Sequence, residues 1–242
     1  MPIRHGRNHR QLRPVGGVMG FTIGSMREMR HIRSGARRRT HASACTTVAE
    51  YTGLCGWAVA PGARATRGGG QCSCGDPGCG TPGAHPLEFA GEVPAGATLE
   101  EAAAAWERVP GAALMLPVGR TFDVIDVAER SGVRALVRLE RMGLRLGPVV
   151  ATPDGRAQFF VAPGAAAELP HLLYRMGWDD ADLDLRCLGP GDHVTAPPSD
   201  LGGLGPVRWL RPPALDAARQ PPEARLLLGT LAYVCHRDRA YA

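Results

Sequence analysis

The order of apolar and polar residues predicts helices and strands along most of the chain. Apolar runs bounded by glycine, proline or polar turns predict strands at residues 57–60, 112–118, 121–127, 148–151, 157–162, 194–199 and 207–210. Apolar residues at helical spacing predict helices at residues 43–56, 98–108, 131–146, 165–178 and 223–236. Together these elements predict an α+β fold.

Local signals refine several of these elements. Thr98 and Glu101 have the spacing of a capping box at the start of the second helix, and Pro170 allows a break in the helix 165–178. Gly119 and Arg120 separate two apolar runs, which predicts a hairpin of 112–118 with 121–127. The turn ATPDGRA predicts a second strand pair around it, and we expect 207–210 to pair with 194–199.

Acidic residues interrupt strands that are otherwise apolar. Strand geometry places Asp126 on the face shared by Val124 and Ala128, with Asp123 on the other face and Glu129 just beyond the strand. A buried carboxylate is costly unless it is paired or binds a metal, although an acid at a strand end can also face water. Asp184 lies between two leucines, and we expect it to be a strand residue whose side chain points away from theirs.

The helix predicted at 131–146 has one apolar side and one row of arginines. Its apolar side consists of Ala135, Leu136, Leu139, Met142 and Leu146, and its cationic row consists of Arg134, Arg138, Arg141 and Arg145. Four aligned cations could follow a nucleic-acid backbone. Such a row is more often the solvated face of a surface helix.

The segment 71–86 holds four metal-ligand side chains but no large apolar residue. Cys72, Cys74, Cys79 and His85 are arranged as C-x-C-x4-C-x5-H among glycines and prolines, as in a tetrahedral zinc site. Disulfides or incidental thiols are the alternatives. Four protein ligands would close the coordination shell, which favours a structural zinc rather than a catalytic one. Cys45, Cys55, Cys187 and Cys235 lack metal spacing and are expected to be small core residues.

The charge of the chain is unevenly distributed. All 28 basic residues of the 242-residue chain are arginines, and the first 40 residues contain ten of them against a single acid, Glu28. The remaining 18 arginines and 22 acids leave the body near −4, that is 18 − 22. A complete lack of lysine is typical of a GC-rich gene, so the high pI is weak evidence for nucleic-acid binding.

These patterns divide the chain into three parts. Residues 1–42 are expected to be a disordered arginine-rich tail, residues 43–210 a folded domain that includes the loop 71–86, and residues 211–242 a proline-rich linker with a C-terminal helix. The tail either contacts phosphates or is simply solvated, and Met19 is an alternative start. The sequence shows no export signal and no apolar run long enough to span a membrane, so we expect a cytoplasmic protein.

Read in order, these segments resemble the bifunctional DNA primase/polymerase N-terminal domain of the archaeo-eukaryotic primase superfamily. The resemblance extends from about Ala49 to Leu210 and rests on the segments AEYTGLCGWAVAPGA, CSCGDPGCGTPGAHP, AAAAWERVPGAALMLPVG, FDVIDVAE, TPDGRAQFFV and LDLRCLGPGDHVTAPPS. It implies a primase-like (RRM-like) mixed sheet flanked by helices, with a small zinc-binding loop inserted. It also implies template-directed nucleotidyl transfer with Mg or Mn, and DNA and nucleoside triphosphates as partners.

The resemblance also assigns roles to residues. It makes Asp126 the first and Asp184 the third metal-binding acid, and it places Gln158 where the family has a histidine that contacts the triphosphate. Ala128 occupies the position of the second acid, and Arg156 replaces a glycine of the turn. Glu129 and Asp123 could substitute for the missing acid, but in a regular strand both point to the face opposite Asp126.

Three functions follow from this pattern. The first is a primase/polymerase-like enzyme that uses Asp126, Asp184 and Glu129, with a separate helicase as a partner because no P-loop is present. The second is a catalytically inactive module that keeps the fold and binds nucleic acid or nucleotides. The third is a zinc-stabilised scaffold that binds another protein.

Overall fold

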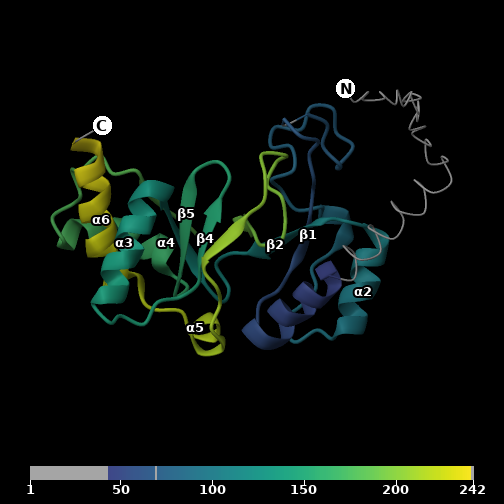
Figure 1. Ribbon diagram of the computed structural model, residues 1–242, viewed down its shortest axis with the longest axis horizontal. Helices are drawn as coiled ribbons and strands as arrows, with labels where there is room; N and C mark the ends of the chain where they lie inside the picture. Colours follow the sequence, from purple (N-terminus) through teal and green to yellow (C-terminus); the bar gives the residue numbers. More distant parts are fainter. Residues whose placement is uncertain (1–42, 69, 241–242) are drawn as a thin grey trace, which may run out of the picture. The chain divides into compact units, whose positions relative to one another are not determined.

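The computed structural model describes residues 43–68 and 70–240, and its elements are shown in Figure 1. All of them belong to one compact unit, Arg38–Ala242. The predictions for the tail 1–42 and its alternative start lie outside the described residues. The predicted α+β class is confirmed: helices flank two sheets, and every pairing between the described strands is antiparallel.

The strands form one small and one larger sheet. The three-stranded sheet has the order β1-β2-β7, with β1 at Ala60–Gly62, β2 at Ala113–Pro117 and β7 at His193–Thr195. The five-stranded sheet has the order β6-β3-β5-β4-β8, with β6 at Leu185–Leu188, β3 at Asp123–Ala128, β5 at Arg156–Val161, β4 at Val149–Thr152 and β8 at Arg208–Arg211. β3 therefore lies between β6 and β5.

The helices form largely where the apolar spacing predicts them. Residues 43–50 are helical and continue into the π-helical turn η1 (Tyr51–Cys55). The others are η2 (Glu88–Ala90), α2 (Leu99–Arg108), α3 (Glu129–Arg141), α4 (Ala165–Arg175), α5 (Leu215–Arg219) and α6 (Ala224–Ala240). The capping box of α2 is present, because Glu101 N donates to Thr98 and Thr98 N donates back to Glu101. No helix within residues 43–240 is long and apolar enough to cross a membrane.

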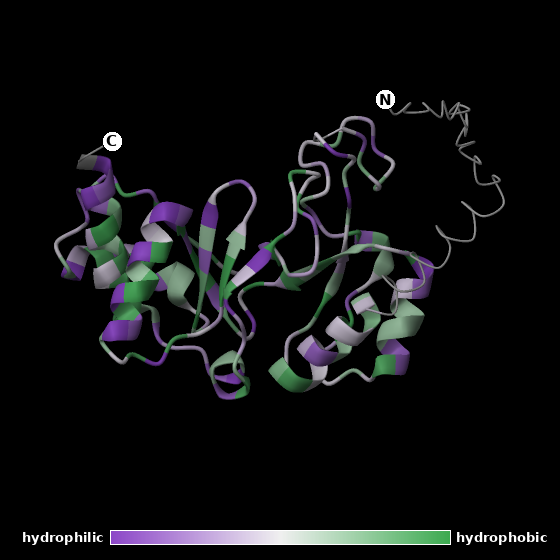
Figure 2. Cartoon of the chain, viewed as in Figure 1, coloured by the Kyte–Doolittle hydropathy of each residue, from purple (hydrophilic) through white to green (hydrophobic). Residues whose placement is uncertain are grey.

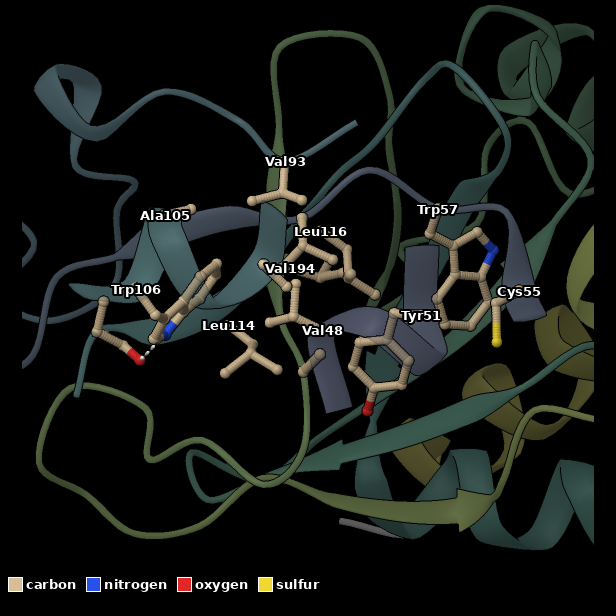
Figure 3. Close-up of a cluster of buried hydrophobic side chains, with 14 of the residues drawn as sticks. Val48, Tyr51, Cys55, Trp57, Val93, Ala105, Trp106, Leu114, Leu116 and Val194 are labelled. Atoms are coloured by element: carbon tan, nitrogen blue, oxygen red, sulfur yellow. Dashed lines mark hydrogen bonds between the residues drawn. The ribbon is translucent and has the colours of Figure 1, made fainter. Parts of the chain in front are cut away.

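Two hydrophobic cores lie on the two faces of the five-stranded sheet. Val124 and Phe160 contribute to the first core, which contains Trp57, Trp106 and the three-stranded sheet and is partly shown in Figure 3. Ile125, the residue after Val124, belongs to the second core, beneath α3, α4 and α6. Hydrophilic and hydrophobic residues alternate along α3 and α6 (Figure 2), as expected for helices that cover a core. The alternation along β3 therefore separates the two cores.

Two predicted strand pairings are wrong. β2 and β3 form no hairpin, because Gly119 (φ 94°) lets the chain turn tightly against Pro190 and pass from one sheet to the other. β7 pairs with β2 and β8 pairs with β4, so the expected pairing of 194–199 with 207–210 is limited to a bridge between Asp200 and Pro206. The sequence signals the turns but not the sheet that each strand joins.

Several element boundaries also differ from the prediction. α3 ends at Arg141 because Gly143 adopts φ 70° and Leu144 N bonds back to Leu139 O, so Arg145 lies beyond the helix. Met142, expected on the apolar side, is 64% exposed. The first strand, β1, begins only at Ala60 rather than at residue 57, and the proline-rich segment contains α5.

The C-terminal helix and the cysteines outside the loop are part of the cores. α6 extends to Ala240, and its buried face, which includes Leu228 and Leu231, belongs to the second core. Cys45, Cys55 and Cys235 are buried and Cys187 is partly buried, as predicted for small core residues.

Candidate functional site

The central strand β3 carries the acid that anchors the candidate site. Asp126 lies opposite Gln158 on β5 and opposite Arg186 on β6 in the antiparallel ladders. Cross-strand partners share one face of a sheet, which is here the face of the first core. The side chain of Asp126 is completely buried.

An arginine bridges the two acids that the family resemblance assigns to metal. Arg156 Nε donates to Asp126 Oδ1 at 2.7 Å, and Arg156 Nη1 lies 2.8 Å from each carboxylate oxygen of Asp184. Burial lowers the pKa of Arg156, but its hydrogen bonds to Asp184 and Asp126 more than offset this and raise it. The guanidinium therefore stays charged between the two carboxylates.

Both oxygens of the Asp126 carboxylate have donors. Oδ1 accepts from Arg156 and lies 3.4 Å from Arg186 Nε, and Oδ2 accepts from Gln158 Nε2 at 3.0 Å. Since a carboxylate can only accept, the amide of Gln158 must turn its NH2 group to Asp126. Its buried Oε1 atom then has no partner among the described residues. This network of two acids and two arginines carries no net charge.

The structure places Asp184 beside this cluster but not within a strand. Asp184 precedes β6, which begins at Leu185, so the expected strand position is wrong. Its side chain is 47% exposed, whereas that of Asp126 is buried. The two acids converge only through Arg156.

The other two candidate acids do not join the cluster. Glu129 begins α3 and forms an ion pair with Arg208 of β8. Asp123 is fully buried on the other face of β3, where Oδ2 accepts from Ala166 N at 2.8 Å in the first turn of α4. A carboxylate at a helix N-terminus is stabilised by the free N–H groups there. Both acids are thus engaged in contacts that hold helices and strands together.

The residues of the acid cluster do not fit a pair of catalytic Mg or Mn ions. Such sites hold the ions between shared carboxylates. Here Ala128 supplies no oxygen, Asp126 is saturated by donors, and the Arg156 guanidinium occupies the space between Asp126 and Asp184. Within residues 43–240, the acids form no cluster of three potential metal ligands.

The predicted arginine row lies on the opposite side of the sheet from Asp126. α3 packs on the second core, where its Gly132 closely approaches Ala157 of β5. Arg134 forms an ion pair with Asp238, and Arg145 lies 3.3 Å from Asp216 outside the helix. Arg138 and Arg141 lie in a groove between α3 and α6 instead. The row therefore does not border the acid cluster.

The segment 71–86 brings its four candidate ligands together. One ligand atom from each of Cys72, Cys74, Cys79 and His85 lies within 4.8 Å of the others. His85 Nε2 is 3.4 Å from both Cys72 Sγ and Cys79 Sγ, whereas His85 Nδ1 faces Pro86 O at 2.9 Å. The Pro86 carbonyl therefore holds the proton on Nδ1 and leaves Nε2 free to coordinate a metal.

The electrostatics of this loop favour a thiolate at Cys72. Burial acts to raise the pKa of Cys72, but N–H groups of Cys74 and Gly83 together with His85 lower it to about 6. Three sulfur ligands and an imidazole fit zinc. Cys72, Cys74, Cys79 and His85 would hold the ion, which would crosslink a loop that has no apolar core of its own.

The loop is also tied to the rest of the domain. Ala63 N donates to His85 O at 2.8 Å, and Ser73 N donates to Arg64 O at 2.8 Å. Gly202 N donates to Gly83 O at 3.2 Å, which joins the loop to residues 200–205. The loop 71–86 is therefore hydrogen-bonded to the segment that leads into β8.

Sequence reasoning missed the part that arginines play in the acid cluster. The resemblance marks Arg156 as a replacement for glycine but does not indicate its partners, and no sequence pattern singles out Arg186. The signal was available in part, since Arg186 follows Asp184 by two residues and the strands around it run antiparallel. Locating Arg156 between both acids requires the register of β3 with β5.

A two-core α+β domain with a Cys3His loop and acids on a central antiparallel strand has the architecture expected of the primase/polymerase class. The family model described as bifunctional DNA primase/polymerase, N-terminal, matches residues 48–224. This match covers well over half of the chain, so the chain belongs to that family. Comparison with curated proteins and with solved structures gave no significant match.

Proposed function

We propose that this chain is a nucleic-acid- or nucleotide-binding member of the primase/polymerase family that has lost metal-dependent nucleotidyl transfer. Family membership supports the choice of ligand. The observation that carries the loss of turnover is the position of Arg156, which bridges Asp126 and Asp184 where two metal ions would be needed. Arg156 and Arg186 together already balance the charge of the two carboxylates, so a divalent ion would gain little electrostatic energy there.

Three residues distinguish the cluster from the family pattern. Ala128 removes one acid, Arg156 adds a cation in place of glycine, and Gln158 replaces a histidine. The loss of metal-ion stabilisation in the transition state costs several kcal/mol. Because all three changes affect the same reacting centre, they support a function in binding rather than in turnover.

A primer-extension and primer-synthesis assay with labelled nucleotides, template and Mn tests this proposal. We expect the wild type to incorporate no more nucleotide than Asp126→Ala, while both bind labelled single-stranded DNA or nucleotide in a salt-sensitive manner. A triple variant, Ala128→Asp/Arg156→Gly/Gln158→His, restores the family residues and should gain incorporation. Incorporation by the wild type that Asp126→Ala abolishes would contradict the proposal.

One observation favours an active enzyme as the second candidate. Asp126 and Asp184 both contact a single guanidinium, so their carboxylates are within reach of one point. If Arg156 moved away when a nucleotide binds, the two acids could hold one ion. The same assay decides, because this candidate requires incorporation by the unmodified chain.

A further inference from the structure

Helices α3 and α6 enclose a groove on the side of the sheet away from the acid cluster. Its volume is about 640 Å³, and a smaller hollow continues it past Met142. The two helices are joined at one end, where Ser131 Oγ donates to Asp238 Oδ2 at 2.7 Å. The groove is thus bounded by two packed helices rather than by loops.

The groove is strongly cationic. Its lining includes Arg130, Arg134, Arg138, Arg141 and Arg237. Asp238 is the single acid among the lining residues, and Arg134 and Ser131 already contact it. Within the described part of the chain, Arg130, Arg138 and Arg141 have no carboxylate partner. A ligand for this groove must therefore bring negative charge.

Apolar side chains form the floor between these cations. Val133 is 38% exposed, Val137 is 42% exposed and Tyr233 is 41% exposed. Met142, 64% exposed, extends the apolar strip at one end. Val133 and Val137 are one helical turn apart, so they form a continuous ridge along α3. This exposed apolar strip would be buried by a ligand that has an apolar face of its own.

The chain itself offers two possible occupants of the groove, its first 40 residues and a second copy, and charge repulsion argues against both. The first 40 residues contain ten arginines and one acid, so they would be repelled by the groove. A second copy placed face to face would bring the same arginines against each other. The phosphates of a nucleic acid would pair with the arginines, but they would also lie against the apolar valines. A base could not stack on Tyr233, because Arg138 already lies over that ring at 5.1 Å.

We propose that this groove binds an acidic amphipathic helix of another protein. Its apolar face covers Val133, Val137 and Tyr233, and its carboxylates pair with Arg138 and Arg141. At 1.5 Å per residue, the stretch from Arg130 to Met142 is about 18 Å long, which accommodates roughly three helical turns.

Fluorescence anisotropy with a synthetic peptide tests the proposal on the full chain. The probe is a labelled peptide of roughly fourteen residues, whose central three helical turns match the length of the groove. It has leucines on one face and glutamates elsewhere, and its scrambled form has the same charge. Arg138→Glu/Arg141→Glu should weaken peptide binding about tenfold or more. Val133→Ser/Val137→Ser should weaken it about fivefold. The matched control, Arg108→Glu/Arg175→Glu, reverses two exposed arginines on other helices and should leave binding unchanged.

Single-stranded DNA is the competing probe. DNA binding that falls with Arg138→Glu/Arg141→Glu, in a chain that does not bind the peptide, would assign the groove to nucleic acid and overturn the proposal. Equal binding of the scrambled peptide, no effect of the serine substitutions, or no peptide binding would also overturn it. Val133 and Val137 lie across the sheet from Asp126, so failure here leaves the proposed function untouched.

Discussion

Arg156 and Asp126 are diagonal neighbours on adjacent strands, and their side chains meet at 2.7 Å on one face of the sheet. Arg156 lies opposite Ala128 in the ladder, so the small alanine leaves room for the guanidinium to reach back to Asp126. The small side chain at position 128 and the cation at position 156 are therefore structurally linked. Ala128 leaves the space that the Arg156 guanidinium occupies.

Removal of Arg156 should destabilise the domain. Arg156→Ala leaves Asp126 buried with only Gln158 and the partly exposed Arg186, so we expect a loss of about 3 kcal/mol, at the lower end for a broken buried pair. Arg186→Ala should cost less than about 1 kcal/mol, because the Arg186 side chain is 64% exposed. Urea unfolding of both variants measures the difference. Equal losses of unfolding free energy in the two variants would mean that Arg156 is not the main partner of Asp126.

Metal binding at the acid cluster should require two substitutions together. Ala128→Asp alone adds a carboxylate next to Arg156, and the guanidinium should simply pair with it. Ala128→Asp/Arg156→Gly adds the ligand and removes the cation, so Mn affinity should rise at least about tenfold over either single variant. Calorimetry on the zinc-loaded protein measures this. Equal Mn affinity of Ala128→Asp and Ala128→Asp/Arg156→Gly would show that Arg156 does not block the site.

The alternation along β3 was predictable, but the arginine network was not. Period-two geometry correctly separates Val124 from Ile125 between the cores, because each strand residue reverses direction. The grouping of the four ligands in 71–86 is equally local, since it depends on short loops between them. Arg156 reaches Asp126 and Asp184 from a third segment, and that contact depends on register.

The wrong prediction of a hairpin between residues 112–118 and 121–127 also arises because local signals do not determine which strands pair. Gly119 and Arg120 mark a turn, yet local signals do not distinguish a turn between paired strands from a passage between two sheets. Here Val118 N donates to Asp192 O, which extends the pairing of β2 with β7. The end of α3 was predictable from Gly143, whose positive φ closes the helix before Arg145.

Loss of a loop ligand should release the metal and loosen two segments. Cys79→Ser removes one of the four ligand atoms that lie within 4.8 Å of one another, so we expect less than one zinc per chain. Amide hydrogen exchange should rise in residues 64–86 and in 200–205, which are joined by Gly202 N to Gly83 O. Exchange in β3 should not change.

The matched control is Cys187→Ser, which changes a partly buried cysteine far along the chain from the loop. It should retain zinc in a colorimetric release assay and keep the exchange pattern of the wild type around residues 64–86. Zinc loss from both variants to the same extent would point to general destabilisation rather than to coordination by Cys79.

The pKa of Tyr233 should report on the arginines of the groove. The hydrogen bond and positive charge of Arg237, and then those of Arg138, favour the phenolate and lower the pKa of Tyr233 below its ordinary value. Removing a cation that stabilises the phenolate must raise that pKa, so Arg237→Gln should shift the titration to higher pH and Arg138→Gln should shift it less.

Burial raises the pKa of Tyr51, which keeps that tyrosine out of the same pH range. Absorbance titration follows the phenolate, with Tyr233→Phe to assign the signal. Arg141→Gln is the matched control, because no contact joins Arg141 to the Tyr233 ring among the described residues. A shift of equal size in that control would mean that the general positive charge of the groove, and not direct contact, sets the pKa.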